Sequence, residues 1–188
     1  MKSKLLIWIT IFIMALGTSC HRESNNKLLH EKGKSQTHAL YLFQQIDSLD
    51  NLGEFNPIIT KDYIAEAEKF AHTYPEDPIS SEFLYKAGLM AMMVAKVSKN
   101  QNSKEMELYA QKALTIFDDI QKIYPEFNGI KECIFYKGVV YEDILDDYEN
   151  AELFYRAFIA RYPSDSSAVN FEFLGKSAEE IFAEFEQR

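Results

Sequence analysis

One stretch of the sequence ends like a phosphate-binding loop. Residues 174–177 read LGKS, and Gly-Lys-Ser closes the loops that hold nucleotide phosphates with backbone N–H groups. Such a loop also needs a glycine five residues before Gly175, and the chain has Asn170 there. We therefore interpret LGKS as part of a helix and expect no nucleotide site.

Other groups that could do chemistry are an acidic stretch and four histidines. Residues 142–150 (EDILDDYEN) lack the alternating ligands and the turn glycine of a calcium loop, so we interpret them as a solvated turn between helices. His21, His30, His38 and His72 have no carboxylate partner at metal-ligand spacing. We expect no catalytic residues, no cofactor, no metal and no small-molecule substrate, and hence a protein that is not an enzyme.

The N-terminal segment resembles an export signal. Lys2 and Lys4 precede fifteen uncharged residues, 5–19, whereas a membrane-spanning helix needs about 20. The run ends in ALGTSC at 15–20, which resembles the lipobox of bacterial lipoproteins. The resemblance implies a signal peptide at 1–19 and acyl chains, such as palmitate, on Cys20. An ordinary cleaved signal and an uncleaved anchor are the alternatives.

Lipidation of Cys20 would hold the chain on a membrane, since several acyl chains anchor a protein durably. Residues 20–35 are polar and bury little, so we expect a flexible linker between the lipid and a folded domain at 36–188. Cys133 would then be the remaining thiol, which we expect to be a buried apolar residue rather than a reactive group. The implied location is the outer membrane, facing the periplasm; surface display remains open.

The charge balance argues against nucleic acid as a partner. The chain has a formal net charge of −9, and removal of residues 1–19, with two lysines and no acids, makes it −11. Binding to phosphates requires clustered lysine and arginine, which this domain lacks.

The apolar periodicity from residue 36 onward is helical, and the prolines stand between periodic segments. No segment alternates with period two for long enough to indicate a sheet. The expected fold is therefore all-α. We expect seven helices, near 36–50, 60–74, 78–98, 103–124, 128–145, 148–162 and 166–187.

Three of these helices end in Tyr-Pro, at 74–75, 124–125 and 162–163. Aligning the three endings shows that other residues recur at fixed offsets, which indicates a repeated helix pair. An alanine stands eleven residues before the tyrosine, an aromatic residue seven before, and a glycine fourteen after; these are Ala113 and Ala151, Phe117 and Tyr155, and Gly88 and Gly138.

This pattern resembles the tetratricopeptide repeat, a helix–turn–helix unit. The unit with the strongest resemblance carries Gly138, Tyr141, Ala151, Tyr155 and Pro163, with one residue inserted between Tyr141 and Ala151. The resemblance implies stacked antiparallel helix pairs in a short right-handed superhelix, with Gly138 and Ala151 facing each other. Together with the lipobox, it is similar to the repeat lipoproteins of the outer-membrane β-barrel assembly machine and to Tol–Pal coordinator proteins.

The resemblance also implies a partner groove on the first helices of successive pairs. Carrying the family's groove positions over gives an apolar strip with an acidic edge, suited to a protein or peptide segment. The alternative is that LMAMMV at 89–94 packs against the helix at 36–50. The carried-over positions are Tyr85, Leu89, Met92, Phe135, Val139 and Glu142.

The sequence thus favours a non-catalytic protein–protein interaction scaffold of the bacterial envelope, of the kind that takes part in outer-membrane protein assembly. Its expected partners are an envelope protein or peptide segment, and the membrane through the lipid anchor. A nutrient- or glycan-binding lipoprotein is the alternative. The single tryptophan, Trp8, lies in the signal and leaves no indole platform for a sugar.

Overall fold

The structure, a computed structural model, describes residues 2–162 and 183, with side chains from residue 26 onward. Within these residues every regular element is a helix. The expected helix at 166–187 lies outside the described residues except for residue 183. The elements are α1 Lys2–Asp50, α2 Pro57–Thr73, α3 Ser80–Ser98, α4 Ser103–Ile123, α5 Ile130–Val139, the π-helical turn η1 Val140–Ile144, and α6 Tyr148–Arg161.

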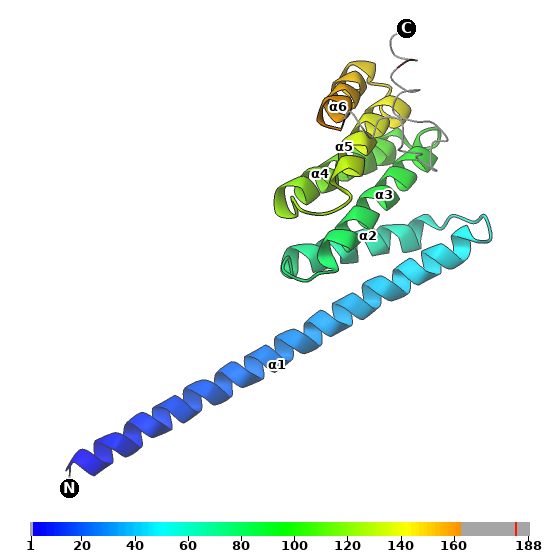
Figure 1. Cartoon of the computed structure of the whole chain (residues 1–188). Helices are drawn as coiled ribbons and strands as arrows, with labels where there is room; N and C mark the ends of the chain where they lie inside the picture. The colour runs from blue at the N-terminus through cyan, green and yellow to red at the C-terminus, as the bar shows by residue number, and fades with distance from the viewer. Residues whose placement is uncertain (1, 163–182, 184–188) are drawn as a thin grey trace.

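The helices stack in chain order, each packed against the next (Figure 1). Short turns join consecutive helices, so neighbours run antiparallel. Three pairs result, α1 with α2, α3 with α4, and α5 with α6, and the contacts of α2 with α3 and of α4 with α5 join the pairs into one stack. The expected all-α fold of stacked helix pairs is confirmed.

The first helix is much longer than expected and extends beyond the stack (Figure 1). Residues 20–35, which we expected to form a flexible linker, continue α1 as helix. Contacts hold their C-terminal end: Lys32 Nζ lies 2.5 Å from Asp77 Oδ2, and Ser35 donates a hydrogen bond to Glu66 of α2. The hydrogen bond from Lys32 holds the pKa of the Asp77 carboxyl below its usual value. The polar composition of residues 20–35 did not predict this helix, because the residues that hold its C-terminal end, Asp77 and Glu66, are polar as well.

The three Tyr-Pro endings adopt one conformation. Tyr74, Tyr124 and Tyr162 are the C-caps of α2, α4 and α6, with φ of −128°, −125° and −131° and ψ of 58°, 60° and 58°. In each case the tyrosine N–H donates to the carbonyl four residues earlier. Because this ψ lies outside the helical range, it suits a residue before proline, and proline cannot continue the helix. The repeated ending is therefore a repeated stop for the second helix of each pair.

The second helix of each pair also begins in a common way. Asn56, Asn102 and Asp147 are the N-caps of α2, α4 and α6, and each side chain accepts a hydrogen bond from a backbone N–H in the first turn. The caps of α3 and α5, Ile79 and Gly129, make no such bond. Local sequence therefore delimits the second helices at both ends, while the first helices depend more on packing.

Two glycines let the helices of a pair approach closely. A Cβ at Gly88 would lie 2.6 Å from Cε1 of Phe117, and one at Gly138 would lie 2.4 Å from Cε1 of Tyr155. The two contacts are equivalent, which supports the repeat register. The atoms nearest to Gly138 belong to Tyr155 and not to Ala151, so the expected pairing of Gly138 with Ala151 is off by one helical turn.

The residue inserted between Tyr141 and Ala151 is absorbed by a π-helical turn. Leu145 N donates to Val140 O at 3.1 Å, the i to i+5 pattern that accommodates one extra residue in a helix. Asp146 then takes a left-handed conformation with φ of 53°, and Asp147 caps α6. The sequence irregularity and the backbone irregularity therefore coincide.

Candidate functional site

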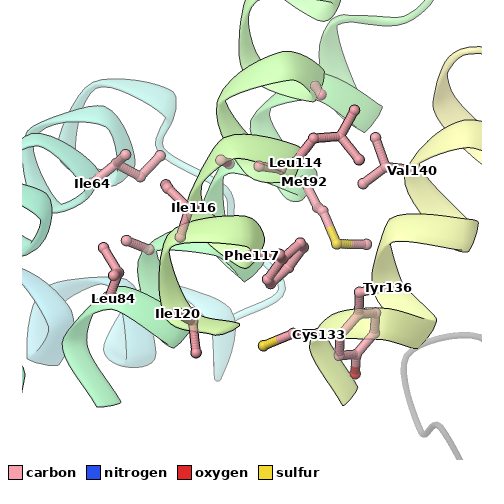
Figure 2. Packing of buried hydrophobic residues seen from close by; sticks show 14 of the residues in the cluster. Ile64, Leu84, Met92, Leu114, Ile116, Phe117, Ile120, Cys133, Tyr136 and Val140 are labelled. Atoms are coloured by element: carbon pink, nitrogen blue, oxygen red, sulfur yellow. The ribbon is translucent and has the colours of Figure 1, made fainter. Parts of the chain in front are cut away.

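Half of the expected groove residues are core. Met92, Phe135 and Val139 are 2%, 0% and 1% exposed. Figure 2 shows Met92 of α3 pointing toward Tyr136 and Val140. The ring of Phe135 packs 5.3 Å from that of Tyr155, between α5 and α6. A partner could not reach these side chains without separating the helices, so the expected strip of six is wrong as a groove.

The remaining three residues of that strip do not form a surface together. Tyr85 packs 5.5 Å from the Phe127 ring and hydrogen-bonds to Tyr136, and its burial raises the pKa of its hydroxyl. Glu142 accepts a hydrogen bond from Tyr155 Oη at 3.0 Å, inside the third helix pair. Leu89 is partly exposed on α3. Tyr85 and Glu142 are therefore engaged by neighbouring elements, and the three residues form no shared surface.

The alternative interpretation of the methionine-rich segment is confirmed for two residues. Met90 and Met93 face the C-terminal part of α1 and line a hollow with Phe43. Met92, between them in sequence, lies on the other side of α3. The hollow is bounded by α1, the turn at 51–56, the start of α2 and α3. Its lining residues are Phe43, Ile46, Asp47, Leu49, Asp50, Glu54, Phe55, Asn56, Thr60, Met90 and Met93.

The floor of this hollow is apolar and its volume is about 90 Å³. At one side, Lys86 Nζ lies 4.2 Å from the centre of the Phe43 ring, a cation–π contact, and 3.3 Å from Glu82 Oε1. Two further apolar side chains, Leu89 and Val97, lie four residues before and after Met93 and so share its side of α3. Val97 is 45% exposed.

The rim of the hollow is acidic and locally unneutralised. Asp47, Asp50 and Glu54 are exposed carboxylates, and among the described residues no lysine, arginine or histidine pairs with them. Many acids elsewhere in the described chain pair across helices. Such pairs include Lys61 with Glu105, Lys112 with Glu68 at 2.8 Å, His72 with Asp119 at 3.2 Å, Lys96 with Asp143 at 3.4 Å and Lys99 with Asp146 at 2.8 Å.

A larger depression, of about 680 Å³, lies on α1 around Leu29, Lys34 and Tyr41. Its described lining residues all come from α1, so no second described element shapes it. The hollow between α1 and α3 is smaller, but four segments converge on it. We therefore take the smaller hollow as the candidate site.

The reactive side chains of the described residues are poorly placed for chemistry. Burial raises the pKa of the Cys133 thiol to about 12, which keeps it neutral, and Cys133 is buried as expected. His72 pairs with Asp119, and His38 lies 3.9 Å from Glu66. Within the described part of the chain, no three histidine, cysteine or acidic residues gather as metal ligands would. The segment LGKS and residue Asn170 lie outside the described residues.

Fold and site together define an all-α stack of helix pairs with an apolar, acid-rimmed hollow near its N-terminal end. Comparison with known proteins found no matching family model, no matching curated protein and no matching solved structure. Over the residues that the structure describes, no helix has the length and hydropathy required to cross a membrane.

Proposed function

We propose that the protein is a non-catalytic protein–protein interaction scaffold of the bacterial envelope, lipid-anchored through Cys20 to the outer membrane and facing the periplasm. The observation that carries the proposal is the hollow between α1 and α3. Its floor is apolar, and its rim carries three carboxylates with which no cationic side chain of the described residues pairs. Stacked helix pairs present such surfaces on elements held in place by their neighbours.

The size of the hollow favours a protein partner over a small ligand. Pockets for small molecules measure roughly 300–1,000 Å³ and enclose most of the ligand. At about 90 Å³ the hollow suits one side chain of a larger partner. This weighs against the nutrient- or glycan-binding alternative. A role in outer-membrane protein assembly would follow if the captured partner belongs to that machinery.

Site-specific photo-crosslinking in intact membranes tests the proposal. A photoreactive amino acid at Leu89, beside the hollow, should give a light-dependent adduct with a discrete protein that mass spectrometry then identifies. The matched control is the same amino acid at Leu108, which is 60% exposed on α4 and lies outside the hollow. No protein adduct from Leu89, or identical adducts from both positions, would contradict a scaffold that acts through this side.

A further inference from the structure

We propose that the hollow between α1 and α3 receives a large aliphatic side chain of a partner protein segment that carries a lysine or arginine within about one helical turn of that side chain. This inference rests on the proposed scaffold function and adds the chemistry of the partner. Three features carry it: the shape of the floor, the charge of the rim, and the position of Lys86.

The floor selects an apolar group. Phe43 of α1 and Met90 and Met93 of α3 line it. Methionine side chains are unbranched and polarizable, so they adapt to aliphatic groups of different shape. The volume of about 90 Å³ accommodates one such side chain but not a segment of backbone. The partner therefore contributes an anchor residue, as residues that fill pockets do at other interfaces.

The rim selects a cation. Asp47, Asp50 and Glu54 stand at the end of α1 and in the turn that follows, where the described residues provide no positive partner. Like charges placed close together repel, and a lysine or arginine from outside would relieve this repulsion. The negative net charge of the chain, −9, adds long-range attraction for a basic segment.

Lys86 determines the orientation of the bound partner segment over the hollow. Its ammonium group lies over Phe43 and pairs with Glu82, so one side of the hollow is already occupied by a cation. A basic residue of the partner would be repelled there and attracted to the rim formed by Asp47, Asp50 and Glu54. The bound segment therefore has its apolar anchor in the hollow and its basic residue on the side away from Lys86.

Selection of peptides by the purified full-length protein tests this inference. A random peptide library displayed on phage should yield peptides in which Leu, Ile or Met stands within four residues of Lys or Arg. A selected peptide is then synthesised and its affinity measured by calorimetry. Selected peptides that lack a basic residue, or failure to select any peptide, would overturn the inference.

Matched variants identify the site. The first variant neutralises the rim by three substitutions, Asp47→Asn, Asp50→Asn and Glu54→Gln. It should lower the affinity for the selected peptide about tenfold at low salt, and high salt should reduce this difference. Asp62→Asn with Glu107→Gln and Glu126→Gln removes the same charge from exposed positions outside the hollow and should leave the affinity unchanged. Equal weakening by the two sets would mean that only net charge matters, and would overturn the site.

A separate variant tests the apolar floor of the hollow. Met93→Lys should abolish binding of the peptide, and the melting temperature shows whether the fold is intact. If that variant unfolds, the exposed rim variants still decide the question. A partner that crosslinks to Leu89 in membranes while the rim variants bind it normally would leave the scaffold proposal standing and overturn this inference about partner chemistry.

Discussion

Replacing Gly138 by alanine tests how the helix pairs close. A Cβ there would lie 2.4, 2.7 and 2.9 Å from three ring atoms of Tyr155, while ordinary contact begins at 3.4 Å. About 1 Å of separation must therefore come from movement of the ring or of a helix. Tyr155 is fully buried, its ring packs against Phe135, and its hydroxyl bonds to Glu142. The Tyr155 ring is therefore held by Phe135 at its side and by Glu142 at its hydroxyl.

The expected cost follows from two opposing terms. Overpacking a core position typically costs about 1–3 kcal/mol, and the fixed Tyr155 ring places Gly138 at the upper end. Alanine in a helix gains up to about 1 kcal/mol over glycine. We expect a net loss of about 2 kcal/mol, or a fall in melting temperature of about 4–8 °C for a chain of this size. Gly138→Leu should cost more.

Thermal unfolding followed by far-ultraviolet circular dichroism measures the effect, and Gly33→Ala is the matched control. Gly33 also lies in a helix, α1, but a Cβ there meets nothing within 4 Å. That variant should keep or raise the melting temperature. Tyr155→Leu should reduce the cost of Gly138→Ala, since contacting residues are not additive. Equal changes for Gly138→Ala and Gly33→Ala would refute the close approach.

Three further predictions concern the anchor, the thiol and the tyrosines. Globomycin should cause an unprocessed precursor to accumulate and Cys20→Ala should release or misprocess the protein; indifference to both would remove the lipid anchor. Cys133 should react with a thiol reagent only after denaturation, because burial raises its pKa to about 12; fast reaction of the native protein would contradict this. Burial raises the pKa of Tyr85 and Tyr155 above the ordinary 10.0. The contribution of these two tyrosines to the free energy of unfolding should therefore be constant below about pH 10 and be lost above it, because they ionise first in the unfolded chain. Urea titrations measure this, and Tyr85→Phe should make the fall less steep.

Local signals in the sequence predicted most of the fold, because the second helix of each pair is delimited locally. Tyr124 and Pro125 stop α4, and Asn102 starts it. The spacing of Gly88 and Phe117 in the sequence then indicates where the two helices of that pair contact each other. The extent of α1 was not predictable in this way, since Lys32 and Ser35 are held by Asp77 and Glu66, which lie more than 30 residues away.

The candidate site was harder to predict, because equivalent positions of the repeat have different surroundings. Lys86 and Leu89 on α3 are partly exposed, whereas Tyr136 and Val139, fifty residues later on α5, are buried. Carrying one set of groove positions to both helices therefore mixes surface with core. The signal that did point to the hollow was the methionine cluster at 89–94, of which Met90 and Met93 face α1.

The distribution of cations gives a physical reason why the hollow stands out. Several lysines pair with acids from another helix or turn, as Lys112 does with Glu68, Lys99 with Asp146 and Lys137 with Asp118. Each such pair contributes little energy at the surface, about 0–1 kcal/mol. Together, however, they give acids beside the contacts between helices a cationic partner. Exposed acids also lie elsewhere on the described surface, as Asp62, Glu107 and Glu126 do. At the end of α1 and in the turn after it, Asp47, Asp50 and Glu54 differ in that they line one apolar hollow, so this negative rim is available to a partner from outside the stack.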